Sequence, residues 1–415
     1  MMSKEKRRVP KLRFPGFTED WEQRKLSDIS TKVTTKNVDV HYTETLTNSA
    51  EQGIISQVDF FDKEISNKDN INGYYIVDNN DFIYNPRIST LAPVGPINRN
   101  KLNRTGIMSP LYTVFRSSNV DLGFLEWYFQ SSHWHRYMKL NGDSGVRADR
   151  IAIKDSTFFE MPIKIPVNIK EQVLIGETLE KFNQYITLHQ RKLDNLKLKK
   201  KALLQKLFPK NGERYPELRF PGFTDAWEQR KLNEFLSVSN FKNTENKYNK
   251  KDVLSVSGDY GIVNQIDFQG RSFAGASVSN YGVVEKGDIV YTKSPLKLNP
   301  YGIIKTNRLN NGIVSTLYAI YKTKENCNSK FIEHYFNLDS RLNQYLKPLV
   351  NKGAKNDMKV SSENVLIGEV CFPKITEQAL IADFLDCLDI YITLHQRKLE
   401  HLKLQKKALL QQMFV

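Results

Sequence analysis

The sequence predicts a mixed α/β (α+β) fold in which two globular domains are separated by two long helices that pair as an intramolecular coiled coil. The first supporting observation is an internal duplication that spans the chain. Residues 10–28, PKLRFPGFTEDWEQRKLSD, return as PELRFPGFTDAWEQRKLNE from residue 216, an offset of 206 (216 minus 10). A helical segment repeats at the same offset, so the chain is two copies of one unit with a pseudo-twofold relation.

The repeats divide the chain into six predicted segments. Residues 29–170 and 235–376 have equal lengths but differ in sequence, and each follows one copy of the repeated segment. We expect each of these inserts to fold with the repeated segment before it. The predicted segments are a disordered basic tail (1–9), a first domain (10–170), a central long helix (171–209), a linker (210–215), a second domain (216–376) and a C-terminal long helix (377–415).

Each long helix carries an apolar heptad seam, with apolar residues at alternating steps of four and three. A histidine and a lysine interrupt both seams at corresponding places. Such polar residues can fix the register of a coiled coil, or they can snorkel toward water. We favour snorkelling for the lysines, and both interpretations stay open for the histidines. The predicted seam residues are Ile186, His189, Leu193, Leu196, Lys200 and Leu203, and Ile392, His395, Leu399, Leu402, Lys406 and Leu409.

The seam pattern fits either direction of pairing. Antiparallel helices would relate the two domains by an approximate twofold axis, which is the symmetry of a DNA site read as two halves. We therefore expect an antiparallel pair.

Within the inserts, short β-branched and aromatic runs bounded by Gly, Asn and Asp indicate strands, and longer stretches with helical spacing indicate helices. The expected strands are 82–84, 113–115, 289–291 and 317–321, with a last strand at 161–166 and 370–373 before each long helix. The expected helices are 122–138 and 329–346.

The charge balance favours a polyanionic partner. The chain has 61 Lys and Arg against 46 Asp and Glu, a net charge of +15, which fits nucleic acid better than a small-molecule substrate. Its three cysteines are far apart, without a CxxC pair, so we expect a reducing cytoplasm and no disulfide framework. An apolar run long enough to cross a membrane is also missing.

The sequence carries no recognisable catalytic or metal-binding motif. A phosphate loop of the GxxxxGK[ST] type is absent. His133 and His135 form the one close histidine pair, and no carboxylate or cysteine spacing completes a metal site. We therefore expect no catalytic residue, no metal and no cofactor in this chain.

Two loops in each insert carry Arg, Lys, Asn and Ser at corresponding places, and these side chains can contact base edges or phosphates. In the first insert the candidate DNA-binding residues are Asn85, Arg87, Ser89, Thr90, Arg147 and Arg150. In the second they are Lys293, Ser294, Lys297, Lys352, Lys355, Asn356 and Lys359.

Two unlike domains between near-identical segments resemble the specificity subunits of type I restriction–modification systems. The PxLRFPGFTxxWEQRKL segments resemble the stretch that opens each half in one bacterial branch of that family, and the YITLHQRKLxxLKLxKKALLQ helices resemble its central and C-terminal regions. The resemblance covers nearly the full chain.

The resemblance implies that each insert is a target recognition domain reading one half of a bipartite double-stranded DNA site. The antiparallel helices would then set the spacer. Two modification subunits would bring S-adenosylmethionine and adenine-N6 methylation, and two restriction subunits can join with ATP and Mg. The alternative from the residues alone is a non-enzymatic coiled-coil scaffold that binds proteins rather than DNA. It would lack the salt-dependent DNA affinity of a DNA reader.

Overall fold

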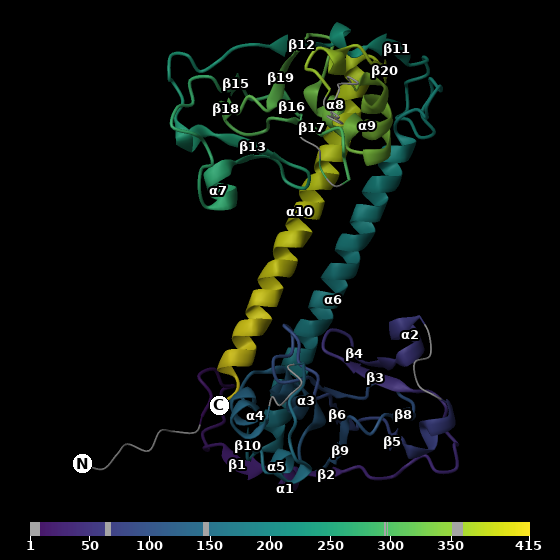
Figure 1. Cartoon of the computed structure of the whole chain (residues 1–415), viewed down its shortest axis with the longest axis vertical. Coiled ribbons are helices and arrows are strands. Elements are labelled where there is room, and N and C mark those ends of the chain that lie inside the picture. Colours follow the sequence, from purple (N-terminus) through teal and green to yellow (C-terminus); the bar gives the residue numbers. More distant parts are fainter. Residues whose placement is uncertain (1–8, 63–67, 144–148, 294–295, 297, 351–359) are drawn as a thin grey trace, which may run out of the picture. The chain divides into compact units, whose positions relative to one another are not determined.

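The computed structural model describes residues 9–62, 68–143, 149–293, 296, 298–350 and 360–415 (Figure 1). All but the last residue of the predicted tail, 1–9, therefore lies outside the described part. The chain divides into two compact units, one formed by Met1–Gln190 with Arg397–Val415 and the other by Arg191–Gln396. The long helices α6 (Ile169–Lys206) and α10 (Ile375–Gln412) each contribute to both units.

The first unit consists of short strands and short helices before α6. Its strands are β1 (Glu22–Lys25), β2 (Ser30–Lys32), β3 (Leu46–Ser49), β4 (Gly53–Ser56), β5 (Tyr75–Val77), β6 (Phe82–Tyr84), β7 (Ile97–Arg99), β8 (Gly106–Met108), β9 (Thr113–Ser117) and β10 (Pro162–Ile165). Its helices are α1 (Leu26–Ile29), α2 (Gln57–Phe61), η1 (Lys68–Gly73), α3 (Leu122–Gln130), α4 (His135–Asn141) and α5 (Asp155–Phe159).

A four-stranded antiparallel sheet, in the order β2-β9-β6-β7, forms the centre of the first unit (Figure 1). Successive side chains of a strand point to opposite faces, and the central strand β6 is buried on both. Phe82 and Tyr84 pack with the aromatic side chains of α3, whereas Ile83 packs with residues of the two-stranded sheets β3-β4 and β5-β8. The central sheet thus lies between a helical layer and a layer of two-stranded sheets.

The second unit repeats this element order. Its strands are β11 (Glu228–Lys231), β12 (Leu236–Ser239), β13 (Leu254–Ser257), β14 (Gly261–Asn264), β15 (Gly282–Val284), β16 (Ile289–Thr292), β17 (Ile304–Thr306), β18 (Gly312–Val314), β19 (Tyr318–Thr323) and β20 (Glu369–Phe372). Its helices are η2 (Leu232–Glu234), η3 (Lys250–Asp252), α7 (Gln265–Gln269), α8 (Ser329–Phe336), α9 (Asp339–Leu346), η4 (Lys347–Leu349) and η5 (Asn364–Leu366).

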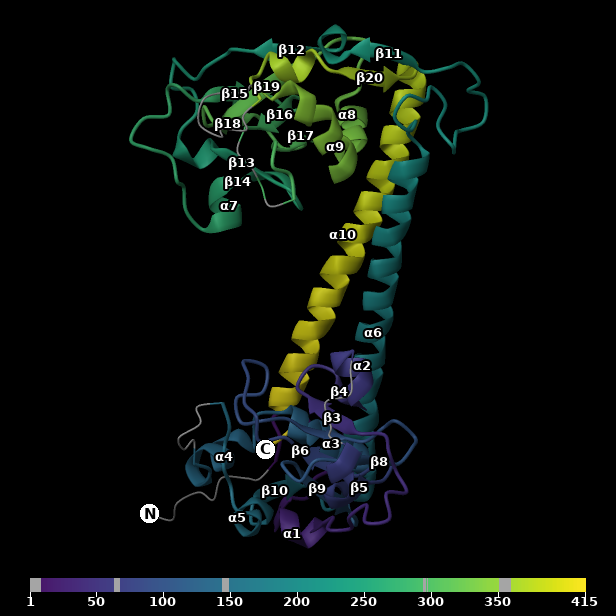
Figure 2. The same cartoon turned by 45° about the vertical axis from the view of Figure 1, so that its right-hand side comes forward.

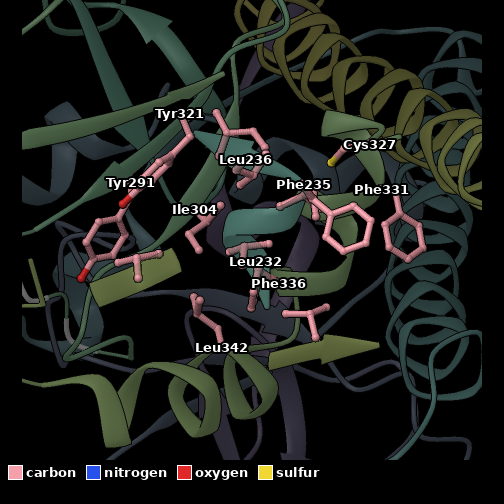
Figure 3. Close-up of a cluster of buried hydrophobic side chains, with 14 of the residues drawn as sticks. Leu232, Phe235, Leu236, Tyr291, Ile304, Tyr321, Cys327, Phe331, Phe336 and Leu342 are labelled. Carbon is pink, nitrogen blue, oxygen red and sulfur yellow. The ribbon is translucent and has the colours of Figure 1, made fainter. Parts of the chain in front are cut away.

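The central sheet of the second unit has the order β12-β19-β16-β17, and α8 and α9 lie beside it (Figure 2). Tyr291 and Ile304 from this sheet pack with Phe336 and Leu342 from the two helices (Figure 3). Val290 faces the opposite side, toward the two-stranded sheets β13-β14 and β15-β18. The recurrence of the same layers in both units confirms the predicted mixed α/β class.

The expectation of one continuous helix at 122–138, and of another at 329–346, is wrong. Each stretch forms two helices, α3 and α4 in the first unit and α8 and α9 in the second. Ser131 is extended, and its hydroxyl donates to the Tyr128 carbonyl at 2.6 Å, which ends α3. In the second unit, the extended backbone of Leu338 separates the helices. The apolar spacing continues through both breaks because the two helices of each pair bury residues in the same core.

The repeated segments form part of the fold of each domain. The EQRK run of each copy is a strand, and β1 pairs antiparallel with β10 as β11 does with β20. Upstream, the guanidinium of Arg13 makes two hydrogen bonds with the carboxylate of Glu171 in the first turn of α6, at 2.7 and 2.8 Å. Arg219 and Glu377 repeat this pair at 2.8 and 2.9 Å. The repeated segment therefore joins each domain to its own long helix.

A second set of ion pairs fixes each domain to the same helix. In the first unit, the ammonium of Lys101 contacts Glu126 of α3 and Glu180 of α6, at 3.1 and 3.3 Å. In the second unit, Arg308 contacts Glu333 of α8 and Asp386 of α10 at 2.9 and 2.6 Å. One cation thus bridges a domain helix and a long helix in each unit.

The long helices pair within each unit, which confirms the predicted coiled coil. In the first unit, the ammonium of Lys406 donates to Asn183 Oδ1 at 2.8 Å, and Ile175 shares a core with Met413. Because the partner's number falls from 413 to 406 as the number on α6 rises from 175 to 183, the helices are antiparallel. In the second unit, Lys200 pairs with Asp389 at 2.6 Å. At the repeat offset of 206, this pair corresponds to Lys406 with Asn183.

The predicted seam residues occupy the less exposed stripe of each helix. The most buried are Leu193, Leu399 and Leu402, at 3, 4 and 6 % exposure. The other nine are intermediate in exposure, and the two histidines are among them. The lysines differ from the snorkelling interpretation, because Lys200 and Lys406 each reach a polar side chain of the opposite helix.

Lys406 also lies over the Trp127 ring, 4.5 Å from its centroid, and burial lowers the pKa of its ammonium. Between this lowered pKa and the ordinary value, the unfolded chain binds more protons, so stability rises with pH in that window. At a pH below the lowered pKa, Lys406 is protonated in both the folded and the unfolded chain, and the folded state bears the full free-energy cost of burying its charge. We expect urea unfolding to show that the wild type gains stability relative to Lys406→Met as the pH rises toward 10.5, the ordinary pKa of lysine. A difference independent of pH would contradict this.

In the described part of the chain, none of the helices is both long and apolar enough to cross a membrane.

Candidate nucleic-acid interface

In both units, a glycine closes the loop that follows the central strand. Asn85 follows β6, and its N–H donates to the Pro96 carbonyl at 3.0 Å, so the two ends of the loop meet. Gly95 has φ +84°, and a Cβ there would lie 2.1 Å from the Asn85 carbonyl oxygen. In the second unit, Gly302 has φ +94°, and its Cβ would lie 1.9 Å from the Thr292 oxygen. A side chain is therefore excluded at both positions.

The two loops predicted to contact DNA in the first unit lie side by side. The backbone N–H of Ile88 donates to the Asp149 carbonyl, and that of Ile151 to the Pro86 carbonyl, both at 2.9 Å. These bonds make an antiparallel bridge between Arg87 and Arg150. The first loop follows β6 and the second follows α4, so the fold brings together residues more than sixty positions apart.

The predicted residues of the first unit differ in what their side chains contact. Arg87 is exposed, with its side chain at 70 %, and its guanidinium is 3.9 Å from the Asp149 carboxylate. Thr90 is also exposed, and Arg150 is intermediate. Asn85 donates to the Asn48 carbonyl and accepts from the Arg87 N–H, at 2.9 and 3.0 Å. Asn85 therefore shapes the loop, whereas Arg87 has the exposure that a DNA contact needs.

Ser89 is a turn residue in the same loop. Its hydroxyl accepts from the Ala92 N–H at 3.1 Å, and its own N–H donates to the Ala92 carbonyl at 3.0 Å. The turn leaves Leu91 70 % exposed at its tip.

In the second unit, the loop after β16 corresponds to the loop after β6. Lys293 is the one predicted DNA-binding residue in the described part of this loop. Lys293 is half-buried, and its backbone N–H donates to the Leu317 carbonyl at 3.2 Å. Asn299 Nδ2 donates to the carboxylate of Asp339 at 3.0 Å, which ties the loop to α9. The remaining predicted DNA-binding residues lie outside the described residues: Arg147, Ser294, Lys297, Lys352, Lys355, Asn356 and Lys359.

Many cations of the two domains are occupied by carboxylates. Arg116 contacts Asp78 and Asp81 at 2.6 and 2.7 Å, and Lys322 contacts Glu285 and Asp288 at 2.6 and 2.9 Å in the corresponding place. Such residues support the fold, so net charge alone does not locate a DNA-binding surface.

Two further exposed cations lie near the predicted loops but were not predicted as DNA-binding candidates. Arg136 and Lys139 lie on α4, directly before the second loop, and both are exposed. Neither cation was among the predicted DNA-binding residues. Their position in the chain, directly before a loop that contains Arg147 and Arg150, could have indicated them as candidates.

His133 and His135 are both half-buried beside aromatic rings, and burial lowers the pKa of both imidazoles. Within the described ranges, no three His, Cys, Asp or Glu residues gather as metal ligands would.

Comparison with known proteins identifies the family. Residues 18–198 and 224–404 each match the family model described as "Type I restriction modification DNA specificity domain". A type I restriction–modification S subunit from M. genitalium has a similar fold, with a TM-score of 0.58 and 13 % identity over 98 % of this chain and 99 % of the other. A chain from a study of assembly and conformational transition of the type I R-M system gives a TM-score of 0.50 and 14 % identity, with coverage of 98 and 99 %. The two family matches span most of the sequence, and the chain therefore belongs to the family of type I restriction–modification specificity subunits.

Proposed function

We propose that this chain selects the DNA target of a type I restriction–modification complex and is not itself catalytic. Each domain reads one half of a bipartite site, and the paired helices set the spacer between the halves. The observation that carries the proposal is the bridge between Arg87 and Arg150, which combines two separate loops at one exposed edge of the first domain. Arginine is suited to such an edge because it binds both phosphates and guanine.

The chemistry would come from partner subunits docked on this chain. Two modification subunits would hold S-adenosylmethionine and methylate adenine at N6. Two restriction subunits, where present, would use ATP and Mg for cleavage. The symmetric attachment of the two domains to their helices supports this arrangement, because it offers each modification subunit an equivalent framework.

Exchange of one insert tests the proposal. In a chain whose residues 29–170 are replaced by residues 235–376, we expect one half of the methylated target to change and the other half to stay. The junctions leave Arg13 and Glu171 in place, and β20 of the transplanted insert takes the position of β10 as the expected partner of β1. The measurement is methylome sequencing of cells that carry the exchanged chain and the modification subunit.

The reciprocal exchange, 235–376 replaced by 29–170, is the matched control and should change the other half. Retained methylation with both halves altered, or with neither altered, would refute independent reading by the two domains.

A further inference from the structure

Each domain presents a small strand–helix element whose helix has no buried residue. The first tip, residues 53–62, contains β4 and α2, and the second tip, residues 261–270, contains β14 and α7. Their sequences, GIISQVDFFD and GIVNQIDFQG, agree although the surrounding inserts differ. The tips share five of their ten residues, including the phenylalanine at positions 60 and 268, so both halves of the chain have this element in common.

The base of each tip is firmly held. Ile54 and Ile262 are buried in the smaller core between the central sheet and the two-stranded sheets of their units, at 7 and 6 % exposure. At the start of each helix, the N–H of Gln57 donates to the Thr45 carbonyl at 2.8 Å, and that of Gln265 to the Val253 carbonyl at 2.9 Å. Each helix is thus presented in a fixed orientation.

The outer side of each tip is aromatic and exposed. Neither α2 nor α7 has a buried residue. Phe60 and Phe61 are 38 and 40 % exposed, with ring centroids 4.6 Å apart. Phe268 is 46 % exposed and lies 5.3 Å from the ring of Tyr260, which is 63 % exposed. Phe60 and Phe268 occupy the same place in their tips, and each lies beside a second exposed ring, Phe61 within the first tip and Tyr260 directly before the second. Exposed apolar surface at one place in both domains indicates a binding surface.

Charge separates the tips from the loops expected to contact DNA. The first tip carries Asp59 and Asp62 and the second carries Asp267, and neither contains a Lys or Arg. A phosphate backbone requires cations, and the loops around Arg87 and Arg150 supply them. Aromatic rings with carboxylates at their edge instead match a protein surface with an apolar pocket bordered by basic residues.

We infer that the two tips are equivalent docking points for two copies of one protein partner, namely the modification subunit. This inference rests on the proposed function, which supplies a partner present in two copies. Phe60 and Phe268 are the anchors, since aromatic side chains that enter a pocket dominate the affinity of such contacts.

The test uses the full-length chain and the purified modification subunit of the same system. We expect Phe60→Ser to weaken one of the two binding events about tenfold, Phe268→Ser to weaken the other, and the double variant to weaken both. Titration calorimetry gives the affinities, and native mass spectrometry gives the stoichiometry. Leu91→Ser and Leu298→Ser are matched controls, because both leucines are 70 % exposed but lie in the loops after β6 and β16. They should leave partner binding unchanged.

Unchanged partner affinity in the double variant would overturn the inference. It would also be overturned if the double variant kept partner binding but lost affinity for DNA, which would assign the tips to nucleic acid. Loss of a self-associated form in sedimentation velocity, with partner binding intact, would assign them to a second copy of this chain. If the wild-type chain fails to bind the modification subunit, the proposed function itself fails.

Discussion

Replacing Phe414 by alanine is expected to lower the free energy of unfolding of the first unit by about 3–5 kcal/mol. Phe414 follows α10 and is 3 % exposed. Its ring lies 5.4 Å from that of Phe124, 5.9 Å from that of Tyr128 and 6.5 Å from that of Trp21. The substitution removes the side chain from the centre of this cluster, and closely packed aromatic neighbours do not readily close the resulting cavity.

Urea unfolding followed by tryptophan fluorescence measures this effect, because three of the four tryptophans, Trp21, Trp127 and Trp134, lie in the first unit. Leu404→Ala is the matched control on the same helix. Leu404 is 66 % exposed, so its truncation should change stability by less than about 0.5 kcal/mol. Equal effects of the two substitutions would show that the cluster around Phe414 does not anchor the helix end.

Phe208 occupies the corresponding place after α6 in the second unit. Its ring lies 5.4 Å from that of Phe331 and 6.2 Å from that of Trp227. Each long helix thus ends in an aromatic anchor that enters a domain core, so the helix ends are fixed by packing as well as by the seam.

The Glu171→Ala substitution is expected to destabilise the first unit by about 3–5 kcal/mol, because it leaves the guanidinium of Arg13 without its buried carboxylate. Glu171 is 1 % exposed, and the Arg13 side chain is 14 % exposed. The Nε1–H of Trp21 also donates to Glu171, at 3.3 Å. One carboxylate therefore satisfies two groups of the repeated segment, and both lose their acceptor in the variant.

The surface pair Lys25–Glu160 provides the control in the same unit. Its side chains are 56 and 53 % exposed, and Glu160→Ala should cost no more than about 1 kcal/mol. Urea unfolding of both variants gives the comparison. The double variant Arg13→Met, Glu171→Met should recover part of the loss, because it removes both charges together. A loss for Glu171→Ala as small as that for Glu160→Ala would refute the role of this pair.

The duplication and the helix seam were predictable because the repeated segments and the heptad spacing can be recognised in the sequence alone. The heptad spacing fixes which face of α6 and α10 is buried, whatever the domains do. Tertiary contacts decided the rest. The hydroxyl of Ser131 ends α3 within an unbroken apolar pattern, and no spacing rule shows that. Lys200 and Lys406 find polar partners that only the pairing of the two helices supplies.

The candidate interface was predictable as loops but not as individual side chains. Asn85 and Arg87 are separated by one residue, and the sequence predicted a DNA contact equally for both. In the structure, Asn85 uses its amide to hold the loop, and Arg87 remains exposed. The difference depends on the Asn48 carbonyl, which lies on a distant hairpin and is invisible to a local pattern.

Gly95 and Gly302 have a consequence for how the loops after β6 and β16 can change during evolution. Each glycine holds both ends of its loop against the last residues of the central strand. Residues between these ends can therefore be replaced as a cassette, without a shift in the sheet that carries them. Under the proposed function, exchange of such cassettes would give new sequence preferences while the strands and helices that carry the loops keep their places.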